Sequence, residues 1–450
     1  MKTKIKKIIF SIFSFAPLLT MGMAKNYTIK SNNNILNKEK LFYNINFVEN
    51  FNNYQETTYK NIGLFINYSE QNNEKSNEKI ELWKSIINTL SPNAIINIYF
   101  FNDLDSFRKE LLKAKKQKNS VLIHAYKQID KNLEKNKESL FELENFALGT
   151  RTINFFPALQ DREYIFDEIY NSILVGSIGE REKKQKINRN IINPNLLYLN
   201  KNNKFKRTSP NIVVQIPWTT NTETGIIEDN ILATVILAAS TSNILISTKI
   251  KEELSKNKEE IVINSILNSA RKNKNYFENS FNNNFIYIGA GVFDYSLAKD
   301  TLEKGNNFII KSNKNKKEHI FKIDLKKDEK LLTHLFWKEN LFEISSKKIL
   351  NLILKALKIQ FLSLNPFNLI SIYNLTDDLT KELVILEEIA DFDLEIEYLD
   401  GDWQIIEKSN SKMLNFEKIE FIAPFTGQYR IIIKNIKEKE RNLSLSYIKK

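Results

Sequence analysis

The sequence has no cysteine, three histidines, 11 glycines and 8 prolines in 450 residues. The absence of cysteine excludes a disulfide scaffold, a zinc–thiolate site, a catalytic thiol and a lipid anchor on cysteine. Any mechanism that needs a histidine base must use His124, His319 or His334. Glycine is too sparse to form a phosphate-cradling loop, because the single pair Gly289-x-Gly291 is a very weak signal. We therefore expect no bound cofactor.

Apolar and basic residues are abundant instead. Hydrophobic residues make up 42% of the chain, which is enough for full cores and excludes a wholly disordered or fibrous protein. The length predicts roughly two or three domains. A net charge of +12 can indicate a nucleic-acid or membrane partner, but no arginine–aromatic pattern typical of RNA binding is present. We expect no nucleic-acid partner and interpret the charge as solvated surface, while contact with a membrane surface stays open.

The first 24 residues have the pattern of an export signal. Four lysines precede the apolar stretch IIFSIFSFAPLLTM at 8–21, and the small residues Gly22 and Ala24 follow it. The stretch is shorter than the ~20 residues that a membrane span needs, and a proline interrupts it. The sequence thus predicts a signal peptide at 1–24 and a secreted or cell-surface protein. An uncleaved N-terminal anchor is the alternative.

The remaining chain divides by its hydrophobic pattern. Residues 25–60 are rich in asparagine without a clear period, and we expect an irregular extension there. Residues 61–305 alternate apolar runs, such as NIGLFIN and AIINIYFF, with amphipathic segments, which predicts a parallel sheet flanked by helices. Residues 306–450 contain short alternating strands and an Asp-Gly turn, which predicts an antiparallel, jelly-roll-like β-sandwich with a helical insertion at about 344–364.

The order of these segments resembles a subtilisin-like serine protease followed by the β-sandwich that often trails that family. NIGLFIN resembles the strand that ends in the catalytic Asp, and SILVGSIGE resembles the strand leading to the oxyanion Asn. SPNIVVQIPW resembles the strand that ends in Ala-Pro-Gly, and GAGVFDYSLA resembles the final turn. AASTSNI at 238–244 falls where Gly-Thr-Ser-x-x-x-Pro opens the central helix. The resemblance implies an α/β peptidase fold.

The positions that the resemblance assigns to catalysis are degenerate. At the acid position the chain has Ile66, or Asn67 with a one-residue shift, and neither can ionise. At the base position it has Lys79. At the oxyanion position Glu180 follows Gly179, and a carboxylate there would repel a developing oxyanion.

Ser240 stands at the nucleophile position, with Ser242 and Leu237 as alternatives because the register is uncertain. A lone serine hydroxyl needs a neighbouring base, and the base in turn needs a group that orients it. We therefore interpret Ser240 as a helix-opening serine and the chain as a pseudoprotease that binds a protein or peptide. Two alternatives remain: a diverged peptidase in which Lys79 serves Ser240 as base, and a structural component of a surface assembly.

Two further sets of residues could bind a metal. Asp391 and Asp393 lie on the same face of a predicted strand and could share a calcium ion, but no ligand-spaced loop with glycine accompanies them. His319 and His334 lie in predicted sandwich strands and could form a metal pair. We favour partly exposed strand histidines and expect no metal.

Overall fold

We analysed a computed structural model of the chain. It describes residues 30–31, 34–35, 45–47, 60–68, 74–130, 142–144, 146–158, 169–180, 190–192, 210–216, 223–248, 252–271, 289–339, 342–343, 385–386, 389–411 and 414–450. The predicted signal peptide at 1–24 and the predicted helical insertion at 344–364 lie outside these residues.

The first half is built on a sheet with six parallel strands, ordered β4-β3-β5-β6-β7-β9. The strands are β3 (Lys60–Asn67), β4 (Ala94–Phe101), β5 (Val121–His124), β6 (Ile153–Pro157), β7 (Ile173–Glu180) and β9 (Ile212–Ile216), with β8 (Asn190–Ile192) antiparallel to β7. This sheet confirms the predicted α/β class.

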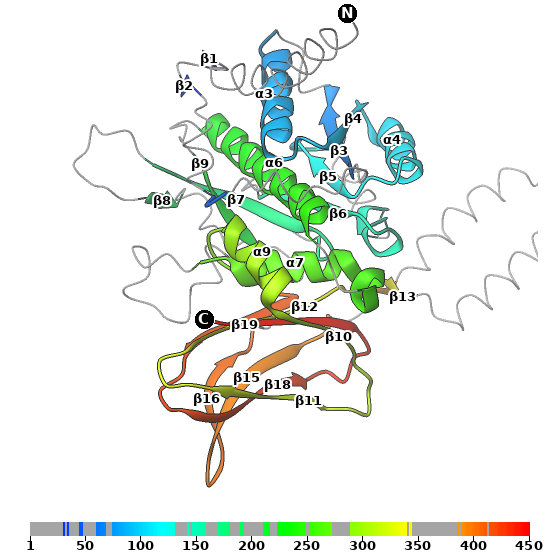
Figure 1. Cartoon of the computed structure of the whole chain (residues 1–450). Coiled ribbons are helices and arrows are strands. Elements are labelled where there is room, and N and C mark those ends of the chain that lie inside the picture. Colours follow the sequence, from blue (N-terminus) through cyan, green and yellow to red (C-terminus); the bar gives the residue numbers. More distant parts are fainter. Residues whose placement is uncertain are drawn as a thin grey trace, which may run out of the picture.

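Helices cover both faces of this sheet (Figure 1). The described helices of this half are α3 (Glu74–Leu90), α4 (Leu104–Lys116), α6 (Glu223–Ser247), η5 (Glu252–Asn257), α7 (Lys258–Ser269) and α9 (Tyr295–Lys304). Because side chains alternate along a strand, Ile66 of β3 packs with α3 and α6, whereas its neighbour Phe65 packs with α4. The sheet thus separates two apolar layers.

Helix α6 is the central helix of the fold. It is 25 residues long and apolar on all sides, which is typical of a helix buried in a core. Its segment Asp229–Ser247 is long and apolar enough to cross a membrane, but 94% of the tested window is buried in the protein. The packing against α3, β6, β7 and β9 accounts for that hydrophobicity.

The second half is a sandwich of two four-stranded antiparallel sheets, as predicted. One sheet has the order β10-β19-β12-β17 and the other β11-β18-β15-β16. Their strands are β10 (Asn306–Lys311), β11 (Glu318–Leu325), β12 (Lys330–Trp337), β15 (Phe392–Asp400), β16 (Asp402–Ser409), β17 (Phe416–Ile422), β18 (Gly427–Asn435) and β19 (Asn442–Lys449). Two short pairs complete the described strands: β1 (Lys30–Ser31) with β2 (Asn34–Ile35), and β13 (Phe342–Glu343) with β14 (Ile385–Leu386).

Part of the predicted N-terminal extension contacts the α/β half. Ile45 is fully buried, and its carbonyl accepts a hydrogen bond of 2.9 Å from the backbone N–H of Tyr295. The ring of Phe47 lies 4.3 Å from that of Tyr295, and the side chain of Asn46 donates to Asp294. Residues 45–47 therefore help to hold the start of α9.

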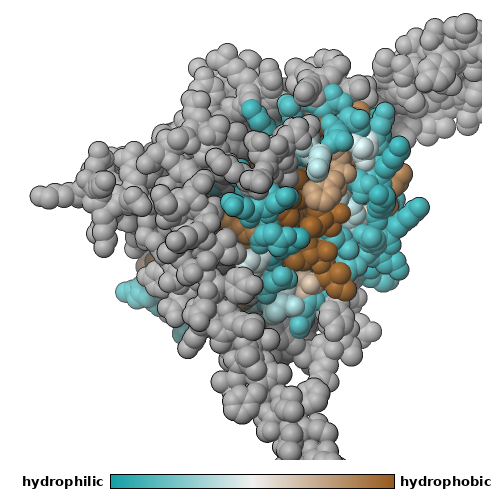
Figure 2. Space-filling model, turned by 90° about the horizontal axis from the view of Figure 1, so that it is seen from above, coloured by the Kyte–Doolittle hydropathy of each residue, from teal (hydrophilic) through white to brown (hydrophobic). Residues whose placement is uncertain are grey.

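The two edges of the parallel sheet differ. At β9, the backbone of Val213 exchanges hydrogen bonds with Gly291 and Phe293, so that a tight turn covers this edge. At the other edge lies β4, where Ile95 and Phe100 are exposed. Figure 2 looks down on the end of the molecule that carries α3, β4 and α4, and shows apolar surface bordered by hydrophilic residues.

Candidate functional site

The carboxyl ends of the parallel strands meet at one edge of the sheet, where α/β proteins place their ligand sites. β3 ends there at Asn67, β5 ends at His124 and β7 ends at Glu180. The acid and oxyanion positions of the resemblance therefore lie at the same edge, together with a histidine. His124 is the last residue of β5.

The acid position holds no ionisable group. Ile66 is fully buried in the layer that α3 and α6 cover. Asn67 is buried too, and its Nδ2 donates a hydrogen bond of 2.7 Å to the carbonyl oxygen of Gln128. An amide cannot carry the negative charge that stabilises an imidazolium, so Asn67 cannot act as a carboxylate would towards a histidine base.

Ser240 does not open the central helix. That helix begins at Glu223, and Ser240 lies in its C-terminal third. The side chain is fully buried, and its Oγ has no hydrogen-bond partner among the described residues. The prediction placed the start of the helix too late in the sequence, because 223–247 is apolar on every face and no helical period marks where the helix starts. Of the two alternatives, Leu237 is also buried inside α6, and Ser242 Oγ pairs with Ser91 Oγ at 3.2 Å.

Lys79 and Ser240 do not form a Ser–Lys pair. The side chain of Asn243 donates to the carbonyl of Leu90 at 2.7 Å, which places the last turn of α3 beside this part of α6. Lys79 lies near the other end of the described part of α3, roughly 16 Å from Leu90 at 1.5 Å per residue. Because Ser240 Oγ lacks a partner among the described residues, no proton can pass between the two groups in this arrangement.

Glu180 is the last residue of β7. Its side chain lies outside the part of the chain that the structure describes, so its role at the oxyanion position stays a prediction.

His124 is the imidazole nearest the candidate edge, and it is part of an aromatic cluster. Its ring is stacked on Phe156, with centroids 3.9 Å apart, and on Phe65 at 5.3 Å. Nε2 donates to Asn154 Oδ1 at 3.3 Å, so Nδ1 accepts from the Tyr126 hydroxyl at 2.8 Å. Burial lowers the pKa of His124 to about 3. The imidazole is therefore neutral and on the α4 side of the sheet, away from Ser240.

The other two histidines are buried, and the prediction of partly exposed side chains is wrong. His334 is fully buried because β12 is an interior strand with the sandwich core on one face and α7 on the other. Its Nδ1 donates to Asn264 Oδ1 at 2.5 Å, and burial lowers its pKa well below the usual value. His319 lies on β11 in the other sheet, and burial lowers its pKa as well. The two histidines belong to different sheets and do not share a ligand site.

One of the two carboxylates proposed for calcium faces an ammonium group. Asp393 Oδ2 lies 2.9 Å from Lys408 Nζ, and Lys408 also lies 3.1 Å from Glu395. Asp391 is buried nearby at the start of β15. Across the described residues, no set of three or more acidic or histidine side chains is arranged to hold a metal ion. Asp393 is thus ion-paired with Lys408 on the sheet.

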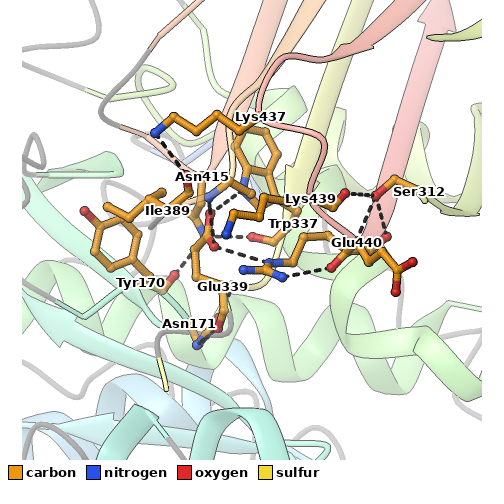
Figure 3. A network of polar contacts seen from close by, with 12 residues as sticks. Tyr170, Asn171, Ser312, Trp337, Glu339, Ile389, Asn415, Lys437, Lys439 and Glu440 are labelled. Carbon is orange, nitrogen blue, oxygen red and sulfur yellow. Dashed lines mark hydrogen bonds and ion pairs between the residues drawn. The ribbon is translucent and has the colours of Figure 1, made fainter. Parts of the chain in front are cut away.

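A polar network at the junction of the two halves was not predicted. Asn171, just before β7, donates to the carbonyl of Glu339, and Glu339 N–H donates back to Asn171 Oδ1 at 2.8 Å. The carboxylate of Glu144 accepts from the backbone and side chain of Asn171. Figure 3 shows Asn171 and Glu339 where the α/β half meets the sandwich.

Glu339 is the centre of this network. Its fully buried carboxylate accepts from Trp337 Nε1 at 2.7 Å and from Ala390 N at 3.1 Å, and Arg441 Nε lies 3.3 Å away. Burial raises the pKa of Glu339, while Arg441 acts in the opposite direction. A second contact joins the halves: Lys418 of β17 donates to the carbonyls of Leu267 and Ala270 at the end of α7, and to that of Ala290 in the turn before α9.

No family model matches the chain, and no curated protein matches it. Among solved structures it is similar to a lanthipeptide protease, with 11% identity over 54% of this chain and 88% of that one, and a TM-score of 0.35. It is also similar to the prenylagaramide maturation protease PagA, with 9% identity over 59% of this chain and 98% of that one, and a TM-score of 0.34.

The pre-peptidase C-terminal domain of a collagenase from Bacillus anthracis is similar over 32% of this chain and 89% of its own length, with 6% identity and a TM-score of 0.19. All three TM-scores are low, so the fold assignment rests on the strand order of the sheets.

Proposed function

We propose that this chain is an exported protein with a subtilisin-like α/β domain that has no proteolytic activity and binds other proteins at the cell surface. The observation that carries the proposal is the state of its three imidazoles. Each one is buried, and the two with the deepest burial donate to asparagine oxygens, not to a carboxylate. Together with the absence of cysteine, this leaves the α/β half without the usual bases and thiols of peptidases.

Proton transfer at the candidate edge supports the same conclusion. A general base works best when its pKa lies near the operating pH, and a pKa of about 3 makes His124 a very weak one. Asn67 replaces the acid with an amide that is already bonded to Gln128. A serine at this edge would keep its proton at neutral pH.

Binding does not need a catalytic triad. A protease cleft holds an extended peptide largely through main-chain hydrogen bonds, which a parallel sheet and its loops provide without ionisable groups. The networks of Glu339 and Lys418 join the two halves. We expect the ligand to be a protein or an extended peptide.

The test for lost catalysis uses the purified chain with casein and a fluorophosphonate probe, beside an active subtilisin as positive control. We expect no fragments and no label. Labelling that mass spectrometry maps to one serine of 61–305, together with casein cleavage that disappears when this serine is changed to alanine, would overturn the proposal. Ser240→Ala and Ser242→Ala are the first variants to compare.

The test for export is fractionation of cells that express the chain with a C-terminal tag, followed by N-terminal sequencing. We expect the protein outside the cytoplasm with an N-terminus near Lys25. A chain that keeps Met1 and stays in the soluble cytoplasmic fraction would contradict export. A chain that keeps Met1 but is accessible on intact cells would support the N-terminal anchor.

A further inference from the structure

Strand β4 is an edge strand without a partner on its outer side among the described residues. The opposite edge of the same sheet is covered, since Val213 of β9 bonds to the turn that contains Gly291 and Phe293. Backbone N–H and C=O groups along an open edge are a template for another strand. The question is what occupies this edge.

The composition of β4 sets it apart from the other edge strands. Its eight residues, AIINIYFF, include no charged residue and no proline. The edge strands of the sandwich, β10, β11, β16 and β17, each contain at least one charged residue. Natural proteins use charged residues, prolines or bulges to prevent an open edge from pairing with another strand. β4 contains neither a charged residue nor a proline.

The side chains of β4 form an apolar row along this edge. Ile96 and Ile98 are only partly buried against the core, and Phe100, on the same face, is 45% exposed. Tyr68, 56% exposed, packs edge-to-face on Phe100 with centroids 6.0 Å apart. This row lies at the end of the molecule where Figure 2 shows apolar surface. An occupant must therefore supply both a strand and apolar side chains.

We propose that a second copy of this chain occupies the edge, with the two β4 strands antiparallel about a two-fold axis. A two-fold axis that passes between the two Ile98 residues keeps each face of the sheet continuous across the dimer. It places Phe100 of one copy opposite Ile96 of the other, and such a pair of an aromatic and a β-branched residue favours strand pairing. The two parallel sheets then form one sheet across the dimer.

Charges at the two ends of β4 fit this antiparallel arrangement. The start of β4 lies near basic residues. Asn61, which pairs with Ile95 of β4, donates a hydrogen bond to the carbonyl of Gln117. Gln117 stands between the exposed residues Lys116 and Lys118. Directly after its end come the exposed acidic residues Asp103 and Asp105. Antiparallel pairing brings the basic end of one strand to the acidic end of the other, whereas parallel pairing would bring like charges together.

The first test is sedimentation velocity of the purified chain over a range of concentrations. We expect a dimer, and we expect Phe100→Lys and Ile95→Lys to weaken it by at least about tenfold in dissociation constant, because each places a charge in the paired edge. Ile436→Lys changes an equally exposed isoleucine on the sandwich and should leave the dimer intact. Far-UV circular dichroism verifies that each variant is folded.

The second test uses the absence of cysteine. In Ile98→Cys the only thiol lies on the two-fold axis, where opposite Cα atoms are about 4.5–5.5 Å apart, within disulfide range. Mild oxidation should give a covalent dimer, whereas Ile436→Cys should stay monomeric on a denaturing gel. A chain that sediments as a monomer, a dimer that survives Phe100→Lys, or equal cross-linking of both cysteine variants would overturn the proposal. The monomer result would assign the edge to a strand of another protein.

Discussion

The two halves of the molecule bury polar groups of different kinds. In the α/β half, the buried polar residues are mostly asparagine, serine and threonine, such as Asn67, Asn154 and Asn230. In the sandwich a much larger share of them is charged, as with Glu339, Glu395 and Lys418. Amides and hydroxyls neither gain nor lose a proton near neutral pH. The half that would house catalysis is thus poor in proton carriers, whereas the charged residues of the other half have structural partners.

The charges of the sandwich are paired on one sheet face. Nη2 of Arg430 lies 2.5 Å from Oε2 of Glu397. The Cζ atom of the same guanidinium lies 4.2 Å from the centroid of the Trp403 ring. Lys434 lies 2.6 Å from Glu395. Because removal of one partner leaves the other charge uncompensated in a poorly solvated place, such pairs are costly to break. The comparison between the halves therefore predicts which substitutions matter most.

The largest effect is expected for Glu339→Ala. The change leaves Arg441 without its buried counter-charge and Trp337 Nε1 without an acceptor. We expect the free energy of unfolding to fall by about 3–5 kcal/mol, measured by urea denaturation. Glu318→Ala removes an exposed carboxylate from the same sandwich and should change it by less than about 0.5 kcal/mol. Equal effects of the two would show that the buried Glu339 network does not stabilise the fold.

Lys418→Met should have the next largest effect. Its ammonium is the donor to two carbonyls at the end of α7 and to the Ala290 carbonyl, and methionine keeps the apolar part of the side chain while removing that donor. We expect a loss of about 2–3 kcal/mol in the free energy of unfolding. Lys327→Met, at an exposed turn, is the matched control. A neutral Lys418→Met would mean that these bonds do not hold the halves together.

The pH dependence of stability should show the burial of His124. Its pKa is about 3 in the folded protein and about 6.5 when unfolded. Between these two pH values the imidazole is protonated in the unfolded state but stays neutral in the folded state. As pH falls below about 6.5, this histidine should reduce the free energy of unfolding by about 1.4 kcal/mol per pH unit. His124→Gln should remove that share of the slope. Parallel profiles for the two proteins between pH 6.5 and 5 would show that His124 is accessible to protons.

Ser240→Ala should have the smallest effect. The hydroxyl is buried and has no hydrogen-bond partner among the described residues, so its removal breaks nothing. We expect a change within about 0.5 kcal/mol in thermal or urea unfolding, and no change in reaction with the fluorophosphonate probe. A loss of labelling in this variant would make Ser240 a nucleophile and break the contrast between the halves.

Much of the fold could be predicted from hydrophobic pattern alone. Apolar runs identified β3 and β4, and alternation identified the sandwich strands, because both patterns reflect which faces of a strand are covered. The start of α6 could not be predicted, since a helix apolar on all sides has no amphipathic period. His334 was misjudged for a similar reason: alternation predicts an exposed face, but α7 covers the outer face of β12.

The junction network was invisible for a different reason. Glu339 and Asn171 lie 168 residues apart in sequence, and neither carries a local pattern that indicates the other. At the candidate site, Asn67 fell at the expected strand end, because strand order and strand ends follow from the pattern. The partner of its side chain could be found only from the tertiary structure, because Gln128 lies 61 residues away, in the segment that follows β5.

The most direct test of the central claim is titration of the three histidine imidazoles by NMR in the folded chain. With three histidines in the sequence, each signal can be assigned by single substitution. We predict that all three pKa values lie below the ordinary value and that His124 titrates at about 3. An imidazole with a pKa near 7 whose signal shifts when a fluorophosphonate is added would contradict the account.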